Sequence, residues 1–296
     1  VAGEAMRNAT VVQTQRGLHL AITDTARNVE YTVASSASGT YVKAFDLTKA
    51  NARCGNDGRN HANAASGLSF KNAKTANAAE EDETPATVDV LVVLDQNALR
   101  YARRMGYGGG EDFAEFAVAK MNTALGNTEL DRDFSFRLAD TYEYPVAIAT
   151  DVETAVYTLQ DHTSLVDIDE RAEECGADLI SVMVDIGSEY GVVGIGRAMQ
   201  NESDWDDPEY LATCYNVCNI RNVVQDHTMT HECGHNMGAG HTDINNGGGP
   251  QLYSYSAGTY FTVDGETYAT IMAYEHLAPG GYSTGVGYFS SPDYTY

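Results

Sequence analysis

The chain has 296 residues, of which 43% are hydrophobic and 20% charged, enough for one medium-sized domain with a smaller attachment. Its 18 basic and 42 acidic residues give a formal net charge of -24. Such a surface repels phosphate backbones and anionic lipids, so we expect neither a nucleic-acid nor a membrane partner. We attribute the acidity mainly to solubility, with a preference for basic substrates as the alternative.

The chain carries no sign of a membrane anchor or an export signal. No apolar run approaches the roughly 20 residues that span a bilayer, and the first residues, VAGEAMRNAT, lack the apolar core of a signal peptide. We expect a secreted, extracellular protein whose signal peptide is absent from this sequence.

Residues 1–55 are predicted to form a small β-rich N-terminal region. LHLAITD, VEYTVAS and TYVKAFDL alternate apolar and polar residues between turn-forming residues, which is typical of short strands. Residues 56–85 are rich in Asn, Ala, Gly and Glu and have too few large apolar side chains to form a core, so they indicate a linker or an exposed loop. We place the main domain at residues 86–296.

The main domain has the pattern of an α/β fold. VDVLVVL at Val88–Leu94 is a strand buried on both faces, and Glu111–Leu125 repeats apolar residues at helical spacing. The elements expected after them are the strand FSFRLAD, helix through most of 152–175, the strand DLISVMVDI, the glycine-interrupted strand GVVGIGRAM and a helix over about 222–237. The glycines of GVVGIGRAM suggest an edge strand or a bulge. Little helix is expected beyond Gly238.

The segment THECGHNMGAGHTD carries the ligands of a catalytic metal centre. On a helix, His231 and His235 share one face and can bind one zinc ion, and Glu232 beside them can take a proton from water. Gly238 suits the left-handed cap that ends the helix, which lets His241 reach the same ion. Three protein ligands leave one position for water, as in catalytic zinc sites.

The full HExxHxxGxxH spacing is a far more specific signal of a zinc site than HExxH alone. The HExxH pattern alone is a modest signal, because it arises by chance in chains of this length, whereas the added glycine and third histidine are rarely found together at these spacings. We interpret the remaining histidines His19, His61, His162 and His276 as ordinary surface or core residues. His227 is expected on the same helix face as His231, as a packing residue or a support for the ligands.

HECGHNMGAGH resembles the extended zinc motif of the metzincins. That resemblance implies a methionine turn further along the chain, and YATIMAY supplies Met272, 31 residues after His241, as the apolar floor beneath the ligands. The resemblance also assigns Tyr274, two residues later, as a residue that binds zinc or stabilises the oxyanion in some metzincins.

Over residues 86–292 the order of elements is similar to reprolysin-like enzymes and to bacterial peptidyl-Asp metalloendopeptidases. This resemblance implies a metzincin-like twisted mixed sheet with an active-site helix and an irregular C-terminal subdomain. The chain departs from reprolysins where Thr242 precedes Asp243, which leaves the subfamily open. In such folds the strand with Gly194, Ile195 and Gly196 would pair with an extended substrate; a plain edge strand is the alternative.

Cys54 lies in ARCGNDG, which resembles the cysteine switch of matrixin propeptides, although the prolines of that motif are absent. A thiolate is a good zinc ligand and would displace the catalytic water, which implies a zymogen that stays inactive until residues 1 to about 85 are removed. The odd cysteine count fits if the other four, Cys175, Cys214, Cys218 and Cys233, form two disulfides. The alternatives for Cys54 are a buried thiol or a different bridge.

The expected function is that of a secreted zinc-dependent endopeptidase that cleaves extracellular proteins or glycoproteins by zinc-activated water, with Glu232 as general base. Zinc is the expected cofactor; Asp243, Asn245 and Asn246 suggest calcium only weakly. One alternative is a peptidase that requires an O-glycan on its substrate. Another is a zinc-containing binding protein with a vestigial site.

Overall fold

The structure is a computed structural model that describes residues 7–49, 52–56, 85–160, 166–199, 201–207, 214–242, 251–253 and 255–291. The predicted linker, apart from its end residues Asn56 and Pro85, lies outside these residues, as do His61, His162 and the three residues of the suggested calcium site. In the described part of the chain, no helix is both long and apolar enough to cross a membrane.

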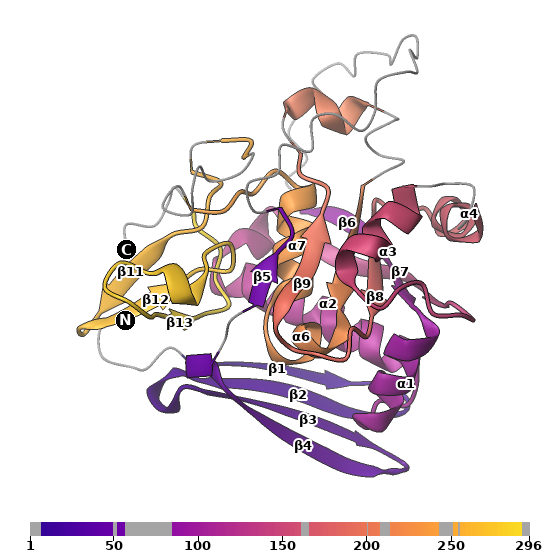
Figure 1. Ribbon diagram of the computed structural model, residues 1–296, viewed down its shortest axis with the longest axis horizontal. Coiled ribbons are helices and arrows are strands. Elements are labelled where there is room, and N and C mark those ends of the chain that lie inside the picture. Colours follow the sequence, from indigo (N-terminus) through magenta and orange to yellow (C-terminus); the bar gives the residue numbers. More distant parts are fainter. Residues whose placement is uncertain are drawn as a thin grey trace.

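A twisted six-stranded sheet, in the order β5-β9-β10-β8-β6-β7, forms the centre of the molecule (Figure 1). Its strands are β5 (Ala52–Cys54), β6 (Ala86–Leu94), β7 (Phe134–Glu143), β8 (Leu179–Val184), β9 (Gly191–Gly196) and β10 (Tyr215–Asn219). Strands β6, β7, β8 and β10 are parallel, whereas β9 runs antiparallel to β10. The predicted mixed α/β architecture is therefore confirmed.

Helices cover both faces of this sheet because β6 is apolar on both sides. Val90, Val92 and Leu94 belong to one buried cluster, and Leu91 and Val93 to another. The first cluster contains residues of α1 (Gln96–Arg104), α2 (Gly110–Asn127), α6 (Ile220–Gln225) and α7 (Thr228–Asn236), and the second contains residues of α3 (Val152–Gln160) and α4 (Val166–Cys175). The continuous apolar run therefore specifies a three-layer arrangement.

The N-terminal region forms a separate antiparallel sheet that packs over the helices (Figure 1). Its strands are β1 (Arg7–Gln13), β2 (Gly17–Asp24), β3 (Val29–Ser36) and β4 (Gly39–Asp46). The last three correspond to the predicted strands; β1 was not predicted. Ala34 and Phe45 belong to the same buried cluster as Phe113 and Phe116 of α2, so the sheet and the main domain share one core.

Buried charges also join this sheet to α2. The Lys120 ammonium lies 2.6 Å from a Glu30 carboxylate oxygen, and both side chains are at least 95% buried. Burial raises the pKa of Glu30, and Lys120 opposes that rise. His19 and Asp112 form a second buried contact at 3.5 Å, and burial lowers the pKa of His19. Since buried charges are costly unless paired, the sheet and α2 depend on each other.

The helix predicted over about 222–237 is wrong as one element, because the structure has two helices there. The chain turns at Asp226, whose carboxylate accepts hydrogen bonds from the backbone N–H of Thr228 at 2.8 Å and from its hydroxyl. These bonds satisfy donors at the start of α7, so the second helix begins with its own polar cap. His227 lies at the junction before α7 rather than on a shared helix face.

The C-terminal part has little helix, as predicted. Its short sheet contains β11 (Tyr260–Val263), β12 (Glu266–Ala269) and β13 (Thr284–Gly285). Within the described residues, the 3-10 turns are Thr25–Arg27, Leu47–Lys49, Leu130–Arg132, Glu202–Asp206 and Glu275–Leu277. The first helix, α1, was not predicted as an element, and the sequence marked residues 211–217, which overlap the inner strand β10, without assigning them a type. Both are short, and their stability comes from burial against neighbours that are distant in sequence.

We expect Lys120→Met to destabilise the full chain by about 3–5 kcal/mol, because it leaves Glu30 buried without its counter-charge. A carboxyl whose folded-state pKa is raised stabilises the fold below its unfolded pKa and loses that contribution as pH rises. The deficit should therefore be larger at pH 8 than at pH 5, as measured by urea unfolding. Lys49→Met, which removes an exposed ion pair with Asp46, is the control and should change little. An equally small effect at Lys120 would contradict the buried pairing.

Candidate active site

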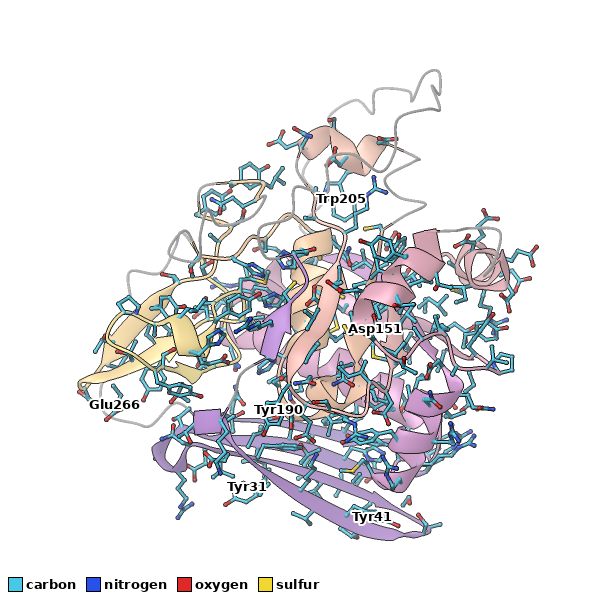
Figure 2. The ribbon with its side chains drawn as sticks, viewed as in Figure 1. Tyr31, Tyr41, Asp151, Tyr190, Trp205 and Glu266 are labelled. Carbon is cyan, nitrogen blue, oxygen red and sulfur yellow. The ribbon has the colours of Figure 1, made fainter. Side chains whose placement is uncertain are left out.

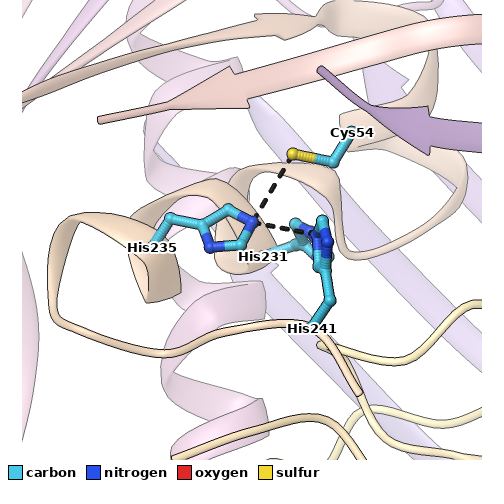
Figure 3. A group of neighbouring side chains, drawn as sticks. All are labelled: Cys54, His231, His235 and His241. Atoms are coloured by element: carbon cyan, nitrogen blue, oxygen red, sulfur yellow. Dashed lines mark hydrogen bonds between the residues drawn. The ribbon is translucent and has the colours of Figure 1, made fainter. Parts of the chain in front are cut away.

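One helix and the turn after it bring three imidazoles together. His231 and His235 lie four residues apart on α7, so they share a face. The helix ends at Asn236, and Gly238 has a φ of 89°, a conformation that favours glycine. This turn, which was predicted, reverses the chain and brings His241 back beneath the helix (Figure 3).

The three rings point their Nε2 atoms at one another. The Nε2 atom of His241 lies 3.0 Å from that of His231 and 3.0 Å from that of His235. The Nδ1 atoms point outward to backbone carbonyls, that of His231 to Ile271 at 2.7 Å and that of His235 to Ala239 at 2.8 Å. Each of these two rings can therefore donate from Nδ1 and keep an Nε2 lone pair for a metal. Burial, followed by the two neighbouring imidazoles, lowers the pKa of His235 well below its ordinary value.

The Cys54 thiol completes the cluster from β5 (Figure 3). Its Sγ lies 3.5 Å from Nε2 of His235, and the four ligand atoms all lie within 4.8 Å of one another. Zinc binds nitrogen at about 2.0–2.1 Å and sulfur at about 2.3 Å, so tetrahedral coordination sets nitrogens about 3.3 Å apart and sulfur about 3.5 Å from nitrogen. The buried His₃Cys set is therefore close to the dimensions that zinc requires.

Glu232 lies between α7 and β9, where two glycines make room for it. A Cβ atom on Gly194 would collide with the Glu232 carboxylate, and one on Gly196 would lie 2.5 Å from the Glu232 carbonyl oxygen. The glycines of this strand therefore permit close packing against the helix. The strand is also irregular, as expected, because its pairing with β5 shifts register at Val193. One Glu232 carboxylate oxygen lies 3.3 Å from the Cys54 Sγ, at the side of the imidazole cluster.

Met272 packs against α7, and Tyr274 lies beside the His241 ring. Met272 is 1% exposed, and its sulfur would lie 2.9 Å from a Cβ atom on Gly234, so any larger residue at this point of α7 would displace the methionine side chain. The Tyr274 hydroxyl lies 3.4 Å from Nε2 of His241 and accepts a 2.9 Å hydrogen bond from the Cys54 backbone N–H. Met272, expected to form the apolar floor, and Tyr274, expected to stabilise the oxyanion, thus both lie next to the imidazole cluster.

Strand β5 covers the outer edge of β9. The two are parallel, with Arg53 opposite Val192 and Cys54 opposite Gly194, and the Gly55 N–H donates to the Gly194 carbonyl at 2.8 Å. The edge on which we expected a substrate, from Gly194 to Gly196, is thus covered by the chain's own segment in this structure. Sequence reasoning did not find this pairing, because a three-residue strand has too little pattern to detect.

The structure contains all five cysteines as thiols, so the two disulfides considered from their odd number are not formed. Cys233 is fully buried in α7 and accepts a 3.3 Å hydrogen bond from the Asn216 side chain, and burial raises its pKa. Such a thiol behaves as a small apolar residue that packs the helix against β10. The odd number of cysteines therefore does not single out Cys54, which is distinguished by its position beside the imidazoles.

Residues 84–290, more than half of the chain, match a reprolysin family model described as Metallo-peptidase family M12. The chain belongs to this metallopeptidase family. It is therefore a zinc metallopeptidase with a metzincin-like fold, as predicted from its extended histidine motif. No curated protein matches it.

Two solved structures are similar to this peptidase. Metalloproteinase-II from Bacteroides fragilis is 13% identical with a TM-score of 0.51; the match covers 99% of this chain and 78% of that one, and shows the fold alone. A structure titled as a chaperone–substrate complex is 15% identical, and its TM-score of 0.46 is too low to support an argument. That match covers 96% of this chain but spans only 39% of the other chain.

The side chains that surround the peptidase centre include several that the sequence did not reveal. Asn236 donates to the carbonyls of Arg197 and Tyr215 at 2.9 and 3.0 Å, and its own side-chain oxygen accepts from Asn216 at 2.9 Å. These bonds attach the end of α7 to the main sheet. Glu275 lies directly after Tyr274 and lines a cavity next to the centre. No sequence motif singles out Asn236 or Glu275, because their neighbours in the structure are distant in sequence.

We expect Gly194→Ala to lower peptidase activity by about 100-fold, because the added methyl group displaces the Glu232 carboxylate. Zinc content and thermal stability should change far less than activity. Gly126→Ala on α2, where the added atom meets nothing closer than 3.6 Å, is the matched control. Full activity in Gly194→Ala would show that Glu232 does not depend on this close approach.

Proposed function

We propose that this chain is an endopeptidase that cleaves internal peptide bonds of extended protein segments, with Glu232 as general base. The observation that carries the proposal is the convergence of three imidazole Nε2 atoms beside that carboxylate. His231, His235 and His241 would hold zinc, which when bound supplies the Lewis acidity that polarises a carbonyl and makes water more acidic.

The chain's own residues would perform the remaining steps. Glu232 takes the proton of the attacking water and delivers it to the leaving amine. The Tyr274 hydroxyl, next to His241, donates a hydrogen bond to the oxygen on which negative charge develops. Met272 fills the space against Gly234 and keeps the ligand-bearing helix at a fixed distance from the turn.

We further propose that Cys54 and β5 keep the chain latent. The thiol occupies the space between Glu232 and His235, where water and substrate have to meet. Its strand also covers the edge of β9, and Asn56 anchors the next turn by donating to the Gly196 carbonyl at 2.8 Å. One short segment thus excludes both the nucleophile and the substrate backbone.

We further propose a location and substrate properties for the enzyme, each with its test. Activity outside the cell is proposed on the resemblance to reprolysin-like and bacterial metallopeptidases alone, and detection of the enzyme in a culture supernatant tests it. A requirement for an O-glycan stays a prediction, so substrate screens should pair each bare peptide with its glycosylated form. Calcium dependence likewise stays a prediction, tested by zinc-loaded activity with and without added calcium.

We expect Glu232→Gln to keep zinc and to lower turnover by a factor of about 100–10,000, because the amide cannot accept the proton. Zinc content by atomic absorption and cleavage of a fluorogenic peptide library, each with and without a chelator, give the two measurements. Glu266→Gln, at the far tip of the three-stranded sheet (Figure 2), makes the same change away from the centre and should be silent. Unchanged turnover in Glu232→Gln would disprove the assigned base.

We expect Cys54→Ser to raise the activity of the full chain by about tenfold or more, because it weakens the contact that holds β5 over the centre. The expected zinc content is unchanged, since three imidazoles remain. Cys175→Ser, at a partly buried thiol on α4, is the matched control. If the two variants have equal activity, Cys54 is not the latency element.

A further inference from the structure

The methionine turn is paired with a segment that no sequence motif marks. The ladder between β11 and β12 continues beyond the two strands, where the Thr270 N–H donates to the Thr259 carbonyl at 3.0 Å and the Thr259 N–H donates to the Thr270 hydroxyl oxygen at 2.9 Å. A Cβ atom on Gly258 would lie 2.3 Å from the Met272 carbonyl oxygen. Residues 258–260 therefore lie directly against the turn, at a point where a side chain would force the two backbones apart.

The same segment also reaches the loop that carries the third histidine. The Gly240 N–H donates to the Ser256 carbonyl at 2.7 Å, and the Gly258 N–H donates to the Gly240 carbonyl at 3.0 Å. Since Gly240 directly precedes His241, residues 256–260 connect this loop to the methionine turn. A movement of either part would break backbone hydrogen bonds, which are costly to lose inside a protein.

Tyr260, the last residue of this segment, holds the backbone of Tyr274. Its hydroxyl donates a 2.7 Å hydrogen bond to the Tyr274 carbonyl, which also accepts from the Leu277 N–H at 3.2 Å. The next carbonyl along the chain, that of Glu275, accepts from the Ser283 N–H at 3.0 Å. The peptide groups after Tyr274 are therefore fixed by partners from both sides of the turn.

His276 lies against the ring of Tyr274. The centroids of the two rings are 5.5 Å apart and their planes differ by 25°. The His231 ring is also nearly parallel to the phenol, at 6.3 Å and 18°. Aromatic pairs with centroids about 4.5–7 Å apart attract each other beyond the effect of burial alone. Unlike His231, His276 lies outside the group that could hold a metal ion, so its ring is available to support the phenol.

These contacts matter most once β5 has left. In this structure the Tyr274 hydroxyl accepts a hydrogen bond from the Cys54 N–H, and that bond would be lost with the strand. The hydroxyl lies 3.4 Å from Nε2 of His241, and an oxyanion donor is effective only when it is already in place as charge develops. Other parts of the chain therefore have to keep the phenol where it is.

We propose that Tyr260 and His276 are positioning residues for the reaction, Tyr260 by fixing the backbone of Tyr274 and His276 by fixing its ring. The proposal rests on the proposed function, in which the Tyr274 hydroxyl donates to the oxygen that becomes negatively charged. It gives the C-terminal three-stranded sheet a part in catalysis, because β11 carries Tyr260 to the Tyr274 carbonyl.

The first experiment uses zinc-loaded, full-length Cys54→Ser protein as the parent. We expect Tyr260→Phe and His276→Ala each to lower kcat by about tenfold, with KM changed by less than about twofold, because the transition state loses a preorganised donor. His276→Phe keeps an aromatic ring and should recover most of the loss. Tyr142→Phe removes a 2.7 Å hydrogen bond to Asp167 at the far edge of the main sheet and should be silent.

The second experiment asks whether both residues act through Tyr274. We expect Tyr274→Phe to lower kcat by about 10–100-fold, because the oxyanion loses its donor. In that background, Tyr260→Phe and His276→Ala should cause no further loss, since there is no hydroxyl left to position. Losses that multiply would show that the two residues act elsewhere and would overturn the proposal.

A binding measurement gives a readout that does not depend on turnover. A phosphinic peptide carries a charged oxygen in place of the developing oxyanion, and calorimetry measures its affinity. We expect Tyr260→Phe and His276→Ala to weaken it by about the factor lost in kcat/KM, and to leave the binding of an uncleaved peptide to Glu232→Gln protein unchanged. A merely structural role would weaken both ligands alike.

The outcomes separate this proposal from the one on which it rests. Normal kcat and normal inhibitor affinity in Tyr260→Phe and His276→Ala would overturn the positioning role, while the peptidase function stands. Failure of the Cys54→Ser parent to cleave any peptide would contradict the proposed function, and the positioning role with it.

Discussion

The mutual approach of three imidazole nitrogens in a buried site is the constraint on which the rest of the structure depends. Lone pairs 3.0 Å apart repel one another unless a cation lies between them, so the arrangement must be imposed by surrounding structure. The carbonyls of Ile271 and Ala239 fix the orientation of His231 and His235. These carbonyls come from the methionine turn and from the reversal after α7, which is why both turns are needed at their exact places in the chain.

Close packing around α7 keeps this arrangement rigid. Gly194 and Gly196 let β9 approach one side of the helix, and Gly234 lets Met272 approach another. A Cβ atom at any of these points would collide with Glu232 or displace Met272, so the distance between the helix, the strand and the turn has little freedom. If Glu232 is the general base that we propose, its position between two backbones means that it needs no large movement to reach a water at the centre.

The sequence contained the parts of the site that are local. The three histidines, Glu232 and Gly238 lie within eleven residues, and helix geometry together with the glycine turn at the end of α7 places them, so their arrangement could be predicted. The break at Asp226 arises because the Asp226 carboxylate accepts a hydrogen bond from the Thr228 N–H, which competes with a continuous helix. The periodicity of apolar residues cannot show which of these two bonding patterns forms. The pairing of β5 with β9, the Lys120–Glu30 contact and the reduced state of the cysteines join residues far apart in sequence. Such contacts leave no trace in the spacing of one chain.

If substrates pair with β9 as we propose, that main-chain pairing would limit which proteins the enzyme can cut. β5 is held there partly by the bond from the Gly55 N–H to the Gly194 carbonyl, and a substrate in its place would have to offer equivalent amide groups. In helices and inner strands those groups are already engaged with their own neighbours. Cleavage would therefore concentrate in inter-domain linkers, loose termini and unfolded chains, so that the conformation of a target protein, as much as its residue sequence, determines whether it is degraded.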